Sequence, residues 1–460
     1  MRMKTIMRFF SALVAAVGVA AVADARPVPG AALKARLQDG PDVIGIVHWG
    51  LNTYSDREWG YGNEDPAMLA PRGFDADQIV QACKAGGLGG LVVVAKHHDG
   101  FCLWPTKTTQ YNISRSPFGG DRGRDYVREM EQACRRAGLK FGVYVSPWDR
   151  NSEHYGSEKY VELYHAQLKE LLGGDYGEVF EMWFDGANGG DGWYGGAEGR
   201  RTIGKDYYRF GDVFAFVREL QPTATIFGGD RDDSDFRWPG NERGVLEDCS
   251  RATTVGVASP RFHAQMNTGS ADGEFFRACE ADFPLRRGWF YHERERGTTK
   301  SGLVLARLFV GNVGNGGTMN LGVAPNKDGV LDDEDVRALK DFKTIRDALF
   351  ANEVREDDGE FNVVELREDL TYGERVDEWR LLAGGREILS GTAIGNRRIR
   401  ILPKAERRGD LKLEITAGDC GAESVAVRCF AAPEKLAAAI LGADTDFDET
   451  DTATWMTRPK

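Results

Sequence analysis

Glu181-Met182-Trp183-Phe184-Asp185-Gly186 is an apolar, aromatic run that ends on a carboxylate and a glycine. Val179 and Phe180 precede it, so the run predicts a buried β-strand with Asp185 at its C-terminal end. In a (β/α)8 barrel, catalytic side chains gather at that end of the strands. A single aspartate in this position is more often the cap of the next helix or turn. The interpretation therefore depends on whether other predicted strands end in the same way.

Short β-type runs alternate with amphipathic helical runs from about residue 41 to residue 326, which is typical of repeated βα units. The expected strands are Val43–His48, Leu91–His97, Phe141–Ser146, Val179–Phe184 and Thr225–Phe227, then three weaker ones at Gly244–Leu246, Gly288–Tyr291 and Thr318–Val323. The expected helices include Ala76–Ala85, Asp125–Ala137, Lys159–Leu172 and Asp212–Leu220. About eight strands over this length favour an α/β fold with a (β/α)8-like barrel over an open doubly wound sheet.

The pattern changes near residue 350. A closing helix is expected at Leu331–Leu349, and strands alternate beyond it, among them Arg398–Leu402, Leu411–Ile415 and Ser424–Phe430. Because 460 residues exceed what one hydrophobic core usually supports, we expect two domains. They are a catalytic barrel over residues 26–350 and a C-terminal β-sandwich with a polar tail over residues 351–460. The sandwich is expected to be a structural module, with glycan binding as the alternative.

The N-terminus has the pattern of a secretory signal peptide over residues 1–25. Basic residues precede an apolar run from Phe9 to Val22, and Ala23-Asp24-Ala25 follows in the cleavage position. An uncleaved N-terminal anchor is the alternative. No other apolar run approaches membrane-spanning length, so we expect no membrane span and an exported protein, periplasmic or extracellular.

The charge of the chain bears on its partners. The formal net charge is −12, and it becomes −14 when the three basic residues and one acidic residue of 1–25 are removed. Such a surface disfavours nucleic acid and anionic membranes and is compatible with neutral glycans. The seven cysteines contain no CxxC spacing, so zinc-ribbon and redox motifs are absent from the sequence.

Polar and aromatic side chains follow the first three expected strands. His48 is at the end of the first strand, His97 and His98 are at the end of the second, and Trp148 follows the third. Imidazoles exchange hydrogen bonds with sugar hydroxyl groups, and aromatic rings cover the apolar face of a pyranose. A zinc site at His48, His97, His98 and Asp185 is the competing interpretation. Neighbouring residues of a regular strand point to opposite sides and no HxH pair is present, so we expect no metal.

Glycosidase chemistry needs a second carboxyl group, because the leaving oxygen must be protonated as the bond breaks. The candidates in the sequence are Asp230, Asp233, Glu242 and Glu280. A general acid is favoured by apolar surroundings, which Trp238 and Pro239 would supply to Glu242. The residues alone do not choose among the four.

With these pieces assembled, the sequence resembles the retaining α-L-fucosidases of glycoside hydrolase family 29. The resemblance runs from about Gly45 to Asp341 and rests on motifs in order along the expected strand ends. They are HWG at 48–50, EWGYGNED at 58–65, KHHDGFCLWPTKTTQYNIS at 96–114, KFGVYVSPWDRN at 140–151, FEMWFDGANGG at 180–190, RWPGNE at 237–242 and RGWFYH at 287–292. SPWDRN, GNE and RGWFYH resemble the subgroup selective for α-1,3/1,4-linked fucose.

The resemblance implies a role for each matching residue. Asp185 is the implied nucleophile and Glu242 the implied acid/base, with Glu280 as the alternative. The implied sugar-holding residues are His48, Glu58, Trp59, His97, His98 and Trp183, and further contacts are expected from Trp148, Arg237 and Trp289. The Gly-rich stretch Gly186–Lys205 is longer than the resemblance predicts; it either shapes the site for the rest of the glycan or is a surface loop.

We therefore expect an exported retaining exo-α-L-fucosidase that acts on a fucosylated oligosaccharide or glycoconjugate without a cofactor. Two alternatives stay open. One is a barrel glycosidase for another sugar, and the other is a non-catalytic protein that binds fucosylated glycans.

Overall fold

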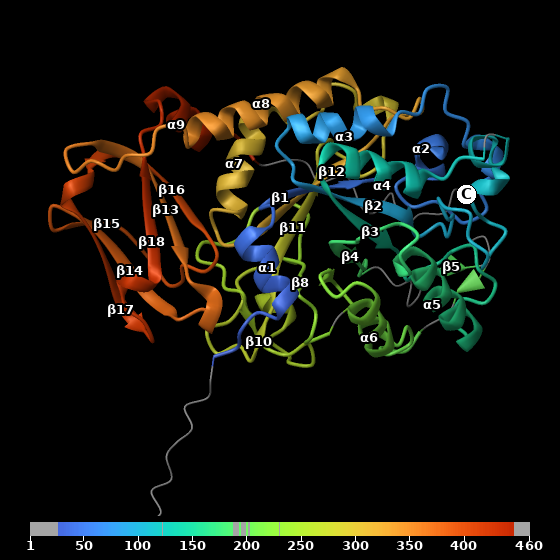
Figure 1. Cartoon of the computed structure of the whole chain (residues 1–460), viewed down its shortest axis with the longest axis horizontal. Coiled ribbons are helices and arrows are strands. Elements are labelled where there is room, and N and C mark those ends of the chain that lie inside the picture. Colours follow the sequence, from blue (N-terminus) through green and yellow to red (C-terminus); the bar gives the residue numbers. More distant parts are fainter. Residues whose placement is uncertain are drawn as a thin grey trace, which may run out of the picture.

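The computed structural model describes residues 26–121, 123–186, 193–194, 199–200, 203–229 and 231–445. The expected signal peptide, most of the Gly186–Lys205 stretch, the candidate acid Asp230 and the tail beyond residue 445 lie outside them. Figure 1 shows a helix-lined barrel beside a smaller part made of two sheets.

Eight parallel strands form a closed barrel, as predicted. In chain order they are β1 (Val43–Val47), β2 (Gly90–Lys96), β3 (Lys140–Val145), β4 (Glu181–Trp183), β7 (Thr225–Phe227), β8 (Phe236–Arg237), β11 (Ala278–Pro284) and β12 (Thr318–Val323). β12 pairs with β1 and closes the barrel, with Met319 opposite Val43.

Helices cover the outside of the barrel. They are α2 (Leu51–Ser55), α3 (Ala76–Ala85), α4 (Tyr126–Ala137), α5 (Glu158–Leu172), α6 (Phe210–Leu220), α7 (Gly302–Asn312) and α8 (Asp333–Leu349). α1 (Ala31–Asp39) precedes the first strand, and its Leu33 and Leu37 pack with Ile44 and Phe180 inside the barrel. Within the described part of the chain, no α-helix lies between β7 and β8 or between β8 and β11, so the fold is (β/α)8-like rather than regular.

The side chains of β4 show how the strands divide the core. Met182 and Phe184 face outward, and Phe184 packs 6.0 Å from the ring of Phe214 on α6. Trp183 faces inward and stacks on Phe227 of β7 at 4.0 Å. Successive strand residues alternate between faces, so Asp185, two residues after Trp183, points the same way as Trp183.

Two of the weaker strand predictions were wrong. Gly244–Leu246 and Gly288–Tyr291 lie in loops, and the sixth and seventh barrel strands are β8 and β11. β8 is only two residues long because Pro239, just beyond it, has no N–H for a ladder hydrogen bond. β11 was not predicted because it carries two buried acidic residues, which interrupt the apolar pattern expected of a buried strand.

The C-terminal part is a β-sandwich, as predicted. One sheet contains β16 (Arg398–Arg407), β13 (Glu360–Glu368) and β18 (Val425–Phe430), and the other contains β15 (Arg386–Gly391), β14 (Val376–Ala383) and β17 (Leu411–Gly418). Phe361 and Leu366 of the first sheet share a hydrophobic cluster with Trp379 and Leu381 of the second. α9 (Glu434–Leu441) follows the last strand.

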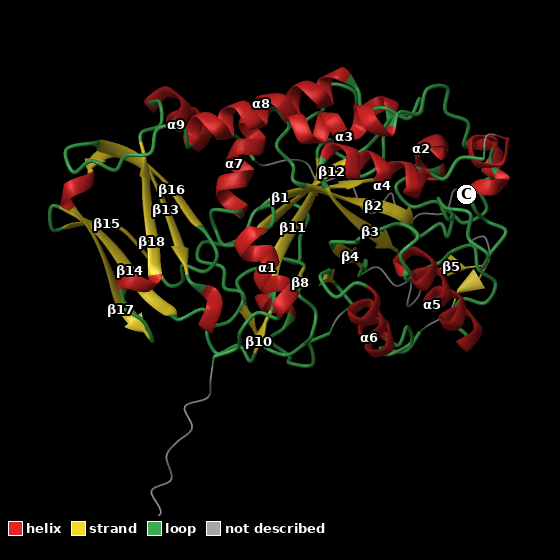
Figure 2. Cartoon of the chain, viewed as in Figure 1, coloured by secondary structure: helices red, strands yellow, loops and turns green. Residues whose placement is uncertain are grey.

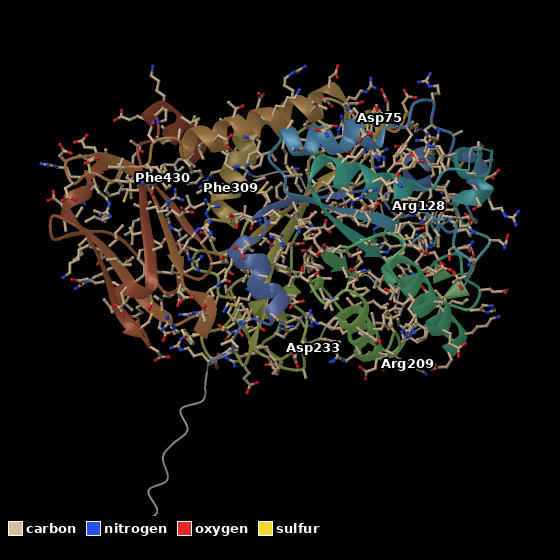
Figure 3. The ribbon with its side chains drawn as sticks, viewed as in Figure 1. Asp75, Arg128, Arg209, Asp233, Phe309 and Phe430 are labelled. Carbon is tan, nitrogen blue, oxygen red and sulfur yellow. The ribbon has the colours of Figure 1, made fainter. Side chains whose placement is uncertain are left out.

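α8 runs along one side of the molecule from the barrel toward the sandwich (Figure 2). Aromatic rings connect the two parts: Phe350, just after α8, lies 6.3 Å from Phe309 of α7 and 5.1 Å from Phe430 of β18. Figure 3 places Phe309 and Phe430 on neighbouring elements at this junction.

All seven cysteines are free thiols, and no helix in the described ranges combines the length and hydrophobicity needed to cross a bilayer.

Candidate active site

A cavity of about 260 Å³ opens at the C-terminal ends of the barrel strands. Nine of the predicted site residues line it: His48, Trp59, His97, His98, Trp183, Asp185, Arg237, Glu242 and Trp289. Three do not: Glu58, Trp148 and Glu280. This volume is below the ~300–1,000 Å³ of sites for drug-sized ligands. The cavity therefore suits a group about the size of one sugar ring.

Asp185 lies at the wall of this cavity just beyond the end of β4. The hydroxyl group of Tyr144, on the neighbouring strand β3, donates a hydrogen bond of 2.8 Å to Oδ2 of Asp185. The Nε2 atom of His98 lies 3.8 Å from the same oxygen. Tyr144 is buried, and burial together with the charge of Asp185 raises the pKa of its hydroxyl group well above the usual value. Tyr144 therefore stays a neutral donor that orients the carboxylate.

The three histidines form one packed cluster. The rings of His97 and His98 are 4.1 Å apart, and those of His48 and His97 are 5.7 Å apart. Residues 97 and 98 would point to opposite sides only in a regular strand, and the strand is not regular at these positions. β2 ends at Lys96, so neither histidine belongs to the regular strand and both line the cavity.

Burial keeps these imidazoles neutral. It lowers the pKa of His48 to about 3 and that of His98 to about 4, and the pKa of His97 lies well below its usual value. The Nδ1 atom of His98 lies 2.7 Å from the Ser146 hydroxyl oxygen, and the Nδ1 atom of His97 lies 3.3 Å from the side-chain nitrogen of Asn52. Neutral rings held this way exchange hydrogen bonds without adding positive charge beside Asp185.

Aromatic rings make up much of the remaining wall. Trp183 stacks between Phe227 and Tyr144, with ring centroids 4.0 and 5.3 Å apart. Trp148 lies behind the wall, where its ring contacts Trp59 at 5.4 Å and His98 at 5.1 Å. Trp148 therefore supports the cavity from outside.

Glu242 and Glu280 occupy different places. Glu242 lies on the loop after β8, lines the cavity and accepts a 3.1 Å hydrogen bond from the indole N–H of Trp289. Glu280 is fully buried on β11, deeper in the barrel, and it accepts hydrogen bonds from Trp183, Thr318 and Asn320. Glu280 thus holds the indole of Trp183 from below.

Glu58 and Arg237 hold the loops of the site. Glu58 accepts hydrogen bonds from the backbone N–H groups of Trp289 and Phe290 and contacts Nε2 of His292 at 2.6 Å. Arg237 donates to the backbone carbonyl groups of residues 251, 266 and 277, which belong to the long segment between β8 and β11. Both side chains therefore position cavity walls through other residues.

Several residues that line the cavity were not predicted from the sequence, among them Tyr144 and Asp282. Tyr144 lies within an apolar strand, where the sequence pattern does not distinguish it from a core residue. Its role becomes visible only in the structure, where it faces inward beside Asp185. Asp282 lies on β11, the strand that the hydrophobic pattern of the sequence failed to reveal.

In the described part of the chain, no group of three histidine, cysteine or acidic side chains is arranged to hold a metal ion.

The fold and the cavity were compared with known proteins. The family model "Alpha-L-fucosidase" matches residues 35–344, which is about two thirds of the chain. The chain belongs to the α-L-fucosidase family. These proteins are glycoside hydrolases, and the matched range contains every residue assigned to the site above.

Among curated relatives, this member of the α-L-fucosidase family is 30% identical over 431 residues to "Alpha-L-fucosidase 1" of Arabidopsis thaliana, with 80% of this chain and 81% of the relative covered. It is 38% identical over 314 residues to "Putative alpha-L-fucosidase 1" of Oryza sativa subsp. japonica. That match covers 66% of this chain but only 56% of the rice protein.

Among solved structures, a glycoside hydrolase 29 family member from an unknown rumen bacterium superimposes with a TM-score of 0.81 at 33% identity. The match covers 89% of this chain and 78% of that one, so it includes both the barrel and most of the sandwich.

Proposed function

We propose that this chain is an exported retaining exo-α-L-fucosidase that removes terminal α-L-fucose from oligosaccharides or glycoconjugates. The observation that carries the proposal is that two carboxyl groups, those of Asp185 and Glu242, face one cavity walled by neutral imidazoles and aromatic rings. Retaining glycosidases need one carboxylate as nucleophile and one carboxyl group as general acid and base.

In the proposed reaction, the carboxylate of Asp185 attacks the anomeric carbon and the glycosidic bond breaks. Glu242 gives its proton to the leaving oxygen, so the aglycone departs as an alcohol and a fucosyl ester of Asp185 remains. Glu242 then takes a proton from water, which attacks the same carbon and frees Asp185. The two displacements together retain the anomeric configuration.

The position of Glu242 supports it as the acid/base over Glu280. A general acid must reach the glycosidic oxygen, and Glu242 lines the cavity. Glu280 lies beneath Trp183 and accepts hydrogen bonds from three donors. Asp233 forms an ion pair with Arg231 at 2.7 Å and its side chain is 57% exposed, away from the cavity wall.

The cavity wall fits a deoxy sugar. Neutral imidazoles of His48, His97 and His98 suit hydroxyl groups, and the ring of Trp289 offers an apolar surface for the methyl group at C6. The small volume admits one terminal sugar unit, which is what an exo-acting enzyme needs. The segments SPWDRN, GNE and RGWFYH support a preference for α-1,3/1,4-linked fucose.

Export is proposed from the pattern of residues 1–25 alone. The test is the cellular fraction in which the full chain accumulates, together with the N-terminal residue of the recovered protein. Recovery outside the cytoplasm with a new N-terminus near residue 26 supports export, and a cytoplasmic chain that starts at Met1 contradicts it.

The activity is tested by measuring L-fucose released from a Lewis-type α-1,3/1,4-fucosylated trisaccharide, 2′-fucosyllactose and an aryl α-L-fucoside. Release from the Lewis-type sugar by the wild type supports the proposal. Asp185→Ala should abolish release, and Asp233→Asn, a matched change of an acid outside the cavity, should leave it unchanged. Silence of the wild type on all three substrates contradicts the proposal.

The role of Glu242 is tested on the activated aryl substrate. Glu242→Ala should slow release from unactivated glycans by roughly 10²–10⁴-fold. Azide should restore turnover of the aryl substrate, because a small nucleophile does not need the general base. Azide rescue of a Glu280→Ala protein instead would assign the role to Glu280.

A further inference from the structure

A third carboxyl group faces the cavity besides those of Asp185 and Glu242. Asp282 follows Glu280 by two residues on β11, so both point into the barrel and Asp282 is nearer the C-terminal end of the strand. Asp282 is part of the cavity wall, and only 3% of its surface is exposed. The proposed reaction uses two carboxyl groups and leaves this one without a role.

The carboxyl group of Asp282 has unused hydrogen-bonding capacity. Its Oδ1 atom is buried and has no hydrogen-bond partner among the described residues, although the backbone N–H of Asp282 itself acts on the carboxyl group. Native proteins rarely keep a buried polar oxygen that neither protein, water nor ligand satisfies. The atom therefore marks a point of the cavity wall where a polar partner is expected.

The cations of the wall are engaged elsewhere. Arg237 donates to the backbone carbonyl groups of residues 251, 266 and 277. The guanidinium group of Arg277 donates to the Thr254 hydroxyl group and to the carbonyl groups of residues 231 and 255. The charges that act on Asp282 are those of the acids Glu242, Glu280 and Asp185.

Burial and the charges of these acids both act on the pKa of the Asp282 carboxyl group. Burial raises the pKa of Asp282 well above its usual value, and the negative charges of Glu242, Glu280 and Asp185 raise it further. Both effects favour the protonated form of the group. Oδ1 can accept a hydrogen bond in either form, and the protonated form can also donate one.

We propose that Asp282 is a specificity-determining residue whose carboxyl group hydrogen-bonds to one hydroxyl group of the fucosyl unit in the cavity. This inference rests on the proposed function, because it names a further contact to the same sugar. A sugar hydroxyl group both donates and accepts, so it can give a hydrogen bond to the unsatisfied Oδ1 atom of Asp282 and can accept one from the group in its protonated form.

The test pairs variants of Asp282 with substrates that lack one hydroxyl group. Asp282→Ala removes the donor and the acceptor, and Asp282→Asn keeps one of each with nearly the same shape. On an aryl α-L-fucoside, kcat/KM should fall roughly 10- to 100-fold for the Ala variant and much less for the Asn variant. Asp282→Ser, which is polar but too short to reach, replaces the Ala variant if that protein does not fold.

The 2-, 3- and 4-deoxy forms of the aryl fucoside then identify the partner. For one of them, the loss that Asp282→Ala causes on the parent sugar should vanish, because the hydroxyl group that it contacts is already missing. For the other two, the variant should lose as much as on the parent sugar. A merely structural residue would lower kcat/KM by the same factor on all four substrates, and that result would overturn the inference.

Binding of L-fucose, measured by calorimetry, separates this inference from the proposed function. The Ala variant should bind L-fucose roughly 10-fold or more weakly than the wild type. Fucose release by the wild type with equal fucose binding by both proteins overturns only the role of Asp282. Absence of release by the wild type contradicts the proposed function, and weaker binding by the variant would still support the contact.

Discussion

The hydroxyl group of Tyr144 and the carboxylate of Asp185 meet at 2.8 Å across two neighbouring strands. Tyr144→Phe removes this hydrogen bond and keeps the ring that stacks on Trp183. A hydrogen bond to a charged group contributes ~1.5–3 kcal/mol, so kcat/KM on an aryl α-L-fucoside should fall roughly 10- to 100-fold. Tyr54→Phe is the matched control, because Tyr54 donates to the carbonyl group of Lys327 outside the cavity. Equal kcat/KM for wild type and Tyr144→Phe would contradict an orienting role.

The buried imidazole of His98 makes the free energy of unfolding of the protein depend on pH. Its pKa is about 4 in the folded chain and 6.5 as the ordinary value, so between these values the unfolded chain binds more protons. The free energy of unfolding attributable to His98 therefore falls as the pH drops from 6.5 toward 4, by about 3 kcal/mol at pH 4.

The His98→Asn variant tests this contribution. Denaturant unfolding of wild type and variant at pH 7 and pH 4 should show a smaller acid-induced loss in the variant. The comparison isolates the imidazole, because buried acids with raised pKa values, such as Asp99, are present in both proteins. An identical pH dependence of the free energy of unfolding in the two proteins would refute the contribution of His98.

At the scale of elements, the loop after β11 depends on Glu58. This carboxylate accepts from the backbone N–H groups of Trp289 and Phe290, and Trp289 in turn donates to Glu242. Glu58 therefore places a wall of the cavity and the candidate acid at once, although it does not line the cavity itself.

In Glu58→Gln, an amide N–H₂ group replaces one of the two oxygens that accept from the backbone N–H groups of Trp289 and Phe290. The loop after β11 should then be held less firmly. We expect kcat/KM to fall about 10-fold, mainly through a higher KM, since each lost hydrogen bond contributes about 1 kcal/mol or more. The measurement is steady-state kinetics on the aryl substrate. Glu293→Gln, an exposed acid on the same loop, is the control and should behave as wild type. An unchanged KM in Glu58→Gln would show that the loop holds its place without this carboxylate.

Prediction of the strands succeeded where the burial pattern was apolar and failed where it was not. β1 to β4 follow apolar runs, and their C-terminal ends brought His48, His97, His98 and Asp185 together as expected. β8 and β11 were missed because one is two residues long and the other carries Glu280 and Asp282 inside the barrel. Inward acids are invisible to a hydrophobic pattern, since their burial depends on partners from other strands.

At the scale of the whole molecule, the sandwich holds part of the active-site wall. Glu374, in the segment that leads into β14, accepts hydrogen bonds from the backbone N–H groups of Ala252 and Thr253. Arg398 of β16 donates to the carbonyl group of Ser250. These contacts fix the segment between β8 and β11, which also contributes Phe262 and Met266 to the cavity wall.

Glu374→Ala should therefore affect stability and activity together. Glu374 is 2% exposed, and loss of its hydrogen bonds leaves buried N–H groups unpaired, so the free energy of unfolding should fall by about 1.5–3 kcal/mol. Loosening of the 250–277 segment should also lower kcat/KM. Glu378→Ala, an exposed acid on β14, serves as the control. Thermal unfolding and kinetics on the aryl substrate provide the check, and full activity in a destabilised Glu374→Ala protein would contradict the coupling.

The covalent bond between Asp185 and the sugar is the step on which the proposed function depends most. The most direct measurement is mass spectrometry of the protein after incubation with 2-deoxy-2-fluoro-α-L-fucosyl fluoride. Fluorine at C2 slows both displacements, and the fluoride leaving group lets the first one proceed, so the intermediate accumulates. We expect one added fluorofucosyl group on the peptide that contains Asp185, and none on the Asp185→Asn variant. A label on another residue, or no label on a wild type that releases fucose, would contradict it.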